Sequence, residues 1–200
     1  MKRLLVLPVL LLTLLVGNPA SSADAKKGLD AAKKGDFATA LREWTPLAEQ
    51  GNSFAQFNLG LMYKKGRGVP QDYKTAIKWY KLAAEQGDAF AQSNLGLMYD
   101  NGQGVPQDYK TAVKWYKLAA EQGHASTQNN LGLMYALGTG TLQDYTRAHM
   151  WWNIAASSGK IKDAPKNRDI IAKKMSPTEL ESAKKLAREC VKKNYKGCGR

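Results

Sequence analysis

The sequence predicts an all-α fold, an α-solenoid of antiparallel helix pairs, and two observations support this. The first is an internal repeat, because residues 71–106 and 107–142 are identical at 26 of 36 positions. The second is a helical period inside each copy, where apolar residues between Tyr73 and Ala84 recur at three- and four-residue steps. One such helix pair cannot bury its apolar face alone, so neighbouring copies must stack.

Evenly spaced aspartates mark the boundaries of the array. Asp36, Asp72, Asp108 and Asp144 are each 36 residues apart, and the copy that starts at Asp36 is degenerate. We expect the solenoid to occupy residues 24–159, with a degenerate first repeat followed by repeats near 52–87, 88–123 and 124–159.

Each repeat is expected to hold two helices. In the first complete copy, Asp72 is a candidate N-cap and Gly87 ends the helix. A second helix is expected from about Asp88 to Asn101. Glycines lie inside this second helix and its counterparts, where each costs up to ~1 kcal/mol of helix stability. Close approach of the partner helix is the expected compensation at Gly60, Gly96 and Gly132.

The N-terminus has the three parts of a secretory signal peptide. Lys2 and Arg3 precede an apolar run from Leu4 to Val16, and small residues then continue to Ala25. We expect residues 1–23 to be removed, with cleavage after Ala23 or, alternatively, after Ala25. The apolar run is shorter than the roughly 20 residues of a spanning helix. The sequence therefore predicts a periplasmic or secreted protein without a transmembrane span, and an uncleaved membrane anchor is the alternative.

The positive charge is concentrated at the C-terminus. The net charge is +13, and residues 160–200 contain 13 Lys and Arg residues against 5 Asp and Glu. We expect this segment to form a basic helical cap, in which Ser176, Pro177 and Glu179 begin a helix. Its apolar stripe is expected to comprise Leu180, Ala183, Leu186, Ala187, Cys190 and Val191.

Two interpretations of the basic cap remain open. It binds an anionic surface of the cell envelope, or it is a solvated end that aids solubility. Nucleic acid is not an expected partner, because the chain is predicted to be exported and has no recognisable nucleic-acid-binding motif.

The repeat motif identifies a family resemblance. The pattern A-x-x-x-L-G-x-x-Y, followed by G-x-G-V-P-Q-D-Y-x-x-A-x-x-W-Y-x-x-A-A-x-x-G, resembles the Sel-one-like (Sel1-like) repeat, a relative of the tetratricopeptide repeat. The resemblance covers about residues 36–159. It implies a right-handed superhelix of helix pairs that binds a protein or peptide segment. The sequence itself has no His, Cys or carboxylate cluster with metal-ligand spacing, and we expect no catalytic residue, cofactor or metal.

An enzymatic alternative follows from the same resemblance, because some cysteine-rich members are described as β-lactamases. Ser157 and Ser182 each precede a lysine at the S-x-x-K spacing, but the companion motifs S-D-N and K-T-G are absent from the sequence. Ala84 and Gln92 stand roughly where the cysteine-rich branch has paired cysteines. Activity on β-lactams or peptidoglycan is therefore the second hypothesis.

The isolated histidines and the recurring aromatic residues are interpreted as structural. His124 stands where the sister repeats have Asn52 and Asp88, which indicates a replaceable polar residue at a helix start. His149 is expected to be packed. The paired aromatics are interpreted as packing residues rather than ligand-stacking groups: Trp79, Tyr80, Trp115, Tyr116, Trp151 and Trp152.

Cys190 and Cys198 are expected to form an intrachain disulfide. Export places them in an oxidising compartment, and their separation of eight residues is similar to that in the cysteine-rich branch. Free thiols, or disulfides between chains, are the alternatives.

Comparison of the repeats with one another predicts the binding face. Residues that stack repeats must recur, whereas residues that face a ligand are free to vary. In the helix that contains Gly60, Gly96 or Gly132, the positions that vary between repeats lie on one helical face. A leucine that recurs in every repeat lies on the same face. By resemblance to the tetratricopeptide pattern this face is concave, and packing of its phenylalanines against the preceding repeat near Trp44 is the alternative. The predicted groove residues are Phe54, Phe57, Leu61, Lys64, Lys65, Phe90, Ser93, Leu97, Asp100, Asn101, Ser126, Asn129, Leu133, Ala136 and Leu137.

Overall fold

The computed structural model describes residues 19–199, which form ten helices and no strand. Residues 1–18, which hold the charged start and apolar run of the predicted signal peptide, lie outside the described residues. The helices are α1 (Pro19–Lys33), α2 (Phe37–Glu49), α3 (Ser53–Lys65), α4 (Tyr73–Glu85), α5 (Ala89–Asn101), α6 (Tyr109–Ala120), α7 (Ala125–Leu137), α8 (Tyr145–Ser157), α9 (Ala164–Ala172) and α10 (Pro177–Lys192).

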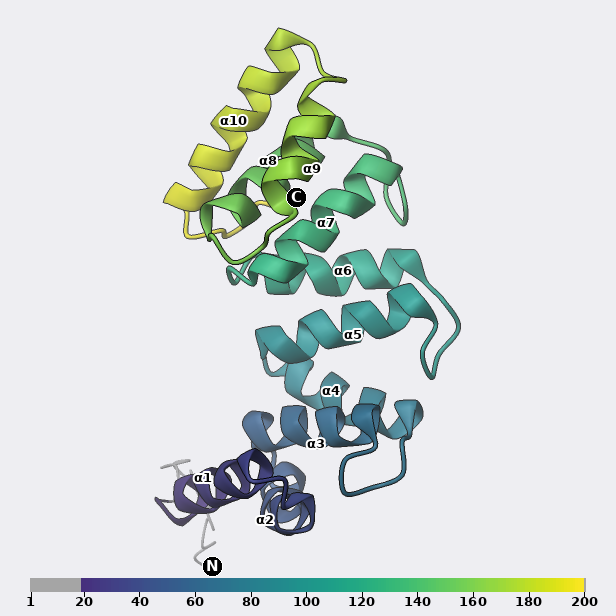
Figure 1. The fold of residues 1–200 in the computed structure, drawn as a ribbon, viewed down its shortest axis with the longest axis vertical. Helices are drawn as coiled ribbons and strands as arrows, with labels where there is room; N and C mark the ends of the chain where they lie inside the picture. Colours follow the sequence, from purple (N-terminus) through teal and green to yellow (C-terminus); the bar gives the residue numbers. More distant parts are fainter. Residues whose placement is uncertain (1–18, 200) are drawn as a thin grey trace, which may run out of the picture.

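Four helix pairs stack along the long axis of the molecule, from α1–α2 at one end to α7–α8 (Figure 1). Within each pair the two helices pack together, and the second helix also packs on the first helix of the next pair. Apolar side chains from successive pairs fill the space between them, among them Trp44, Tyr80, Tyr116 and Trp151. The predicted all-α solenoid is confirmed.

Glycine allows the two helices of each pair to approach closely. A Cβ atom on Gly60 would lie 2.6 Å from the ring of Tyr80, and one on Gly96 would lie 2.6 Å from the ring of Tyr116. Gly132 has the same relation to Trp152, at 2.9 Å. The close approach expected from the sequence is therefore present, because any larger residue would overlap an aromatic ring.

A recurring glutamine joins each repeat to the one before it. The buried side chain of Gln92 donates a hydrogen bond of 3.0 Å to the carbonyl of Ala84, at the end of the preceding helix. Its amide oxygen accepts a second bond from Gln122. Gln56 and Gln128 bond Ala48 and Ala120 in the same way. Ala84 and Gln92, the positions compared above with a cysteine pair, are thus linked by a hydrogen bond.

The C-terminal cap departs from the repeat pattern, because α9 and α10 both pack on α8. Ser176 and Glu179 form the predicted capping box at the start of α10. The predicted apolar stripe is partly wrong, since Leu186 and Val191 are 38% and 46% exposed. The buried residues of α10, Ala183, Ala187 and Cys190, lie on one face of the helix.

Candidate protein-binding face

Helices α3, α5 and α7 lie side by side on one face of the solenoid, which we call the α3–α5–α7 face. The rings of Phe57 and Phe90 join α3 to α5, with centroids 6.0 Å apart. Lys64 Nζ donates to Asn94 Oδ1 across the same boundary at 2.9 Å. Between α5 and α7, the Thr127 hydroxyl donates to the Ser93 hydroxyl at 2.6 Å.

The predicted groove residues all lie on these three helices, and none of them is buried. Seven are exposed: Phe54, Lys65, Phe90, Asn101, Ser126, Leu133 and Leu137. The other eight are half-buried: Phe57, Leu61, Lys64, Ser93, Leu97, Asp100, Asn129 and Ala136. Their accessibility permits binding, but a groove formed by them stays a prediction.

The three phenylalanines of this face, Phe54, Phe57 and Phe90, differ in how much they pack against other aromatic residues. Phe54 meets the edge of Trp44 at 6.2 Å, as the packing alternative expects, and Phe57 lies 5.9 Å from the ring of Tyr80. Phe90 is 58% exposed, and its ring lies 6.0 Å from the ring of Phe57 and 5.0 Å from the ring of His124. An exposed aromatic ring is therefore held in place on this face.

A hollow of about 360 Å³ opens beside Phe90. His124 and Ser126 line it from the start of α7, and Lys160 and Ile161 line it from the segment after α8. His124 stands at the N-cap of α7, as expected, but its side chain makes no capping hydrogen bond. Its Nδ1 contacts the Thr127 hydroxyl at 2.6 Å, and burial lowers the pKa of the imidazole.

One position of this face changes character from repeat to repeat, from Lys64 through Asp100 to Ala136. The carboxylate of Asp100 accepts a hydrogen bond of 3.2 Å from the Tyr116 hydroxyl. Burial raises the pKa of the Asp100 carboxyl, and this hydrogen bond opposes the rise. Burial, together with the neighbouring Lys65, lowers the pKa of the Lys64 ammonium.

At the end of α7 the predicted groove residues Leu133 and Leu137 form an exposed apolar surface that also includes Leu142, which was not among the predicted residues. Leu133 and Leu137 are 47% and 64% exposed, and Leu142 in the following loop is 88% exposed. The preceding repeat has Pro106 where this one has Leu142, so the departure from the repeat was visible in the sequence.

The serines considered for the enzymatic hypothesis are not arranged as nucleophiles. The Ser157 hydroxyl lies at the end of α8 and donates to the carbonyl of Ile154 at 2.7 Å. Ser182 is exposed on α10. Over residues 19–199, the acidic, histidine and cysteine side chains form no group of three that could hold a metal ion.

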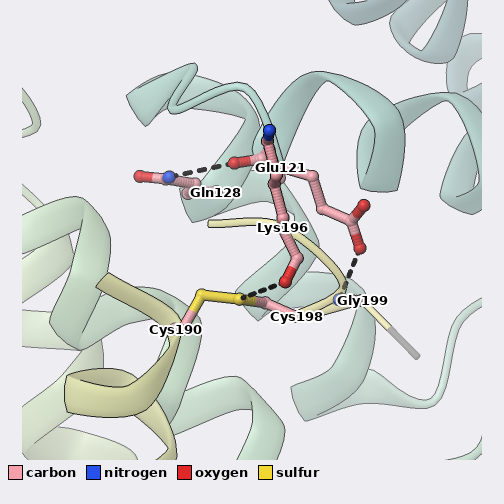
Figure 2. The surroundings of a disulfide bond; sticks show 7 residues. Glu121, Gln128, Cys190, Lys196, Cys198 and Gly199 are labelled. Carbon is pink, nitrogen blue, oxygen red and sulfur yellow. Dashed lines mark hydrogen bonds between the residues drawn. A yellow bond between two sulfur atoms is a disulfide. The ribbon is translucent and has the colours of Figure 1, made fainter. Parts of the chain in front are cut away.

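The structure contains the predicted disulfide between Cys190 and Cys198 (Figure 2). The closed loop turns the chain back onto α6, where the backbone N–H of Gly199 donates to Glu121 Oε1 at 2.8 Å. The ring of Tyr195 lies beside Gly123 in the same region. These contacts connect the end of the chain to a helix 78 residues earlier in the sequence.

Comparison with known proteins identifies the repeats. The family model for the Sel1 repeat matches residues 53–88, 89–124 and 125–160. No curated protein sequence matches the chain. Within residues 19–199, none of the helices has the length and apolar character needed to cross a membrane.

Two solved structures illustrate the likeness. The chain is 31% identical to a Sel1 repeat protein from Oxalobacter formigenes, with a TM-score of 0.66, covering 86% of this chain and 77% of that one. It is 28% identical to c5321, described as a protective antigen present in uropathogenic Escherichia coli strains with an SLR fold. That match has a TM-score of 0.63 and covers 90% of this chain but 47% of c5321, about half its length. The family match covers more than half of the chain, which therefore belongs to the Sel1 repeat family.

Proposed function

We propose that this protein is an exported scaffold that binds a segment of a partner protein in a groove on its α3–α5–α7 face. The observation that carries the proposal is Phe90, a large aromatic residue that is 58% exposed on a face where three repeats meet. Exposed aromatic side chains in defined positions are typical anchors of protein interfaces. The exposed Leu133 and Leu137 extend the apolar surface along the same face.

A site-specific crosslink tests the proposal. A photoreactive phenylalanine analogue at position 90 should yield a discrete protein adduct in the envelope fraction or the culture medium. The same analogue at Leu82, which is 44% exposed on α4, is the matched control. Adducts that form equally from both positions, or from neither, would refute the groove.

The proposed export has a structural consequence at α1. The indole N–H of Trp44 donates to the carbonyl of Ala25 at 3.2 Å, and Ala25 packs against the buried apolar residues around Trp44. Cleavage after Ala25 would remove this contact, whereas cleavage after Ala23 would keep it. We therefore propose Asp24 as the first residue of the mature protein, and N-terminal sequencing of the exported form checks it.

The basic cap is proposed to bring the scaffold to an anionic envelope surface. Its lysines include Lys173, Lys174, Lys192, Lys193 and Lys196, all of them exposed. Binding to anionic lipid vesicles should weaken steeply with salt, because the Debye length is about 8 Å at physiological ionic strength. Vesicle binding that survives replacement of these five lysines by glutamine would contradict this part of the proposal.

A further inference from the structure

Two tyrosines of successive repeats occupy equivalent places but differ in their hydrogen bonding. Tyr80 and Tyr116 pack their rings on Gly60 and Gly96 with the same spacing, since a Cβ on either glycine would lie 2.6 and 2.7 Å from two ring atoms. Both side chains are fully buried. Their hydroxyls therefore lie at equivalent positions along α3 and α5, four residues after the glycine. These positions are held by Lys64 on α3 and by Asp100 on α5.

In the second of these repeats the tyrosine hydroxyl has a carboxylate partner. The Tyr116 hydroxyl donates to Asp100 Oδ2 at 3.2 Å, and Asn130 of the next repeat lies beside it. The chain thus supplies an example of the group that fits this position, which is a carboxylate between two neighbouring helices.

In the repeat before it the same position lacks this partner. The Tyr80 hydroxyl is buried and has no hydrogen-bond partner. Lys64 and Asn94, which replace Asp100 and Asn130, bond each other instead. A buried donor without an acceptor costs free energy, and the half-buried Lys64 ammonium is matched only by a neutral amide oxygen. Both groups would be satisfied by one anionic acceptor.

We propose that the boundary between α3 and α5 binds the carboxylate side chain of an aspartate or glutamate in the partner segment, which accepts hydrogen bonds from the Tyr80 hydroxyl and the Lys64 ammonium. The flexible lysine side chain moves to admit the ligand. Phe57 and Phe90 join the same two helices and supply an apolar surface for a side chain next to the acidic one. This inference rests on the proposed binding face and specifies the chemistry of its partner.

Blocked dipeptides test the site without knowledge of the partner. The probes are acetyl-Phe-Asp-amide and its isosteric control, acetyl-Phe-Asn-amide, and the readout is the NMR shift of the Asn94 side-chain amide. We expect the aspartate probe to bind about tenfold more tightly or better, as for a hydrogen bond to a charged group. Equal affinities, or no shift with the aspartate probe, would overturn the inference.

Two pairs of variants locate the effect. Tyr80→Phe and Lys64→Ala should each weaken binding of the aspartate probe about tenfold. The matched variants Tyr116→Phe and Lys78→Ala should leave it within about twofold, because the Tyr116 hydroxyl already bonds Asp100 and Lys78 is an exposed residue of α4, outside the predicted groove. Similar losses in Tyr80→Phe and Tyr116→Phe would refute the assignment.

A third probe and the unliganded protein complete the test. Acetyl-Phe-Ala with a free C-terminus should bind no better than the asparagine probe. Tighter binding would mean that the site recognises the C-terminal carboxylate of a chain and not an acidic side chain, which would overturn the inference. Without ligand, Tyr80→Phe should keep or raise the melting temperature, whereas Tyr116→Phe should lower it. If the dipeptides fail to bind but the crosslink from position 90 succeeds, only the carboxylate site is refuted. If the dipeptides bind as expected but the crosslink fails, the groove for a protein segment is refuted.

Discussion

At the scale of single residues, the glycine–aromatic contacts set the distance between paired helices. Gly96→Ala should destabilise the protein by about 1–3 kcal/mol, the usual cost of overpacking a core, even though alanine is the better helix former by up to ~1 kcal/mol. The added methyl group would overlap the ring of Tyr116. Urea unfolding measures the effect, with Asn101→Ala at an exposed position of the same helix as the control. If the variant is as stable as the wild type, the ring of Tyr116 moves to accommodate the methyl group and the expected overpacking is absent.

We expect His149 to make the stability of the fold depend on pH. His149 is buried, its Nδ1 has no hydrogen-bond partner, and burial with Arg168 and Lys184 nearby lowers its pKa. The unfolded chain takes up a proton near pH 6.5 and the folded chain only at lower pH, so stability is lost as pH falls below that value. Val113 is its counterpart in the preceding repeat.

His149→Val should therefore lose less stability than the wild type between pH 7 and pH 5. Thermal unfolding at both pH values measures the difference. His124 has a pKa lowered in the same direction, so the dependence is reduced rather than abolished. An unchanged pH dependence would mean that the folded protein protonates His149 without cost.

At the scale of elements, α7 differs from its sister helices at its start. Asn52 and Asp88 cap α3 and α5 by accepting hydrogen bonds from the backbone, whereas His124 makes no such bond. His124→Asn should stabilise the protein by about 1 kcal/mol, the typical effect of an N-cap side chain. Asn52→Ala is the reciprocal control and should cost a similar amount. A loss of stability in His124→Asn would show that the contact of the imidazole with Phe90 outweighs the cap.

The sequence predicted the helices well because each follows from a local pattern that recurs. Asp72, Gly96 and the capping box at Ser176 are all explained by residues within one helix or its partner. The exposure of Leu186 was not predictable, because it depends on which face of α10 packs on α8. The difference between Tyr80 and Tyr116 also required the fold, since the Tyr116 hydroxyl finds its acceptor, Asp100, on another helix and the Tyr80 hydroxyl has no acceptor.

At the scale of the whole molecule, the disulfide loop ties the C-terminal cap to the middle of the array. Reduction should lower the free energy of unfolding by about 2–3 kcal/mol, as expected for a loop this short. It should also release the contact between Gly199 and Glu121. Urea unfolding with and without reductant gives the first quantity, and faster amide exchange at Gly199 reports the second. A Glu121→Gln variant that keeps the protection of Gly199 would show that the disulfide alone holds the tail.

The glutamine bridges have a consequence for the evolution and engineering of length. Each junction between repeats uses the same bond, from Gln56 to Ala48, from Gln92 to Ala84 and from Gln128 to Ala120. A duplicate of residues 89–124 inserted after His124 would meet a matching neighbour on both sides, so no junction has to be redesigned. The number of repeats can therefore change without altering the α1–α2 pair or the C-terminal cap. The length of the binding face can in this way be matched to a longer or shorter partner segment.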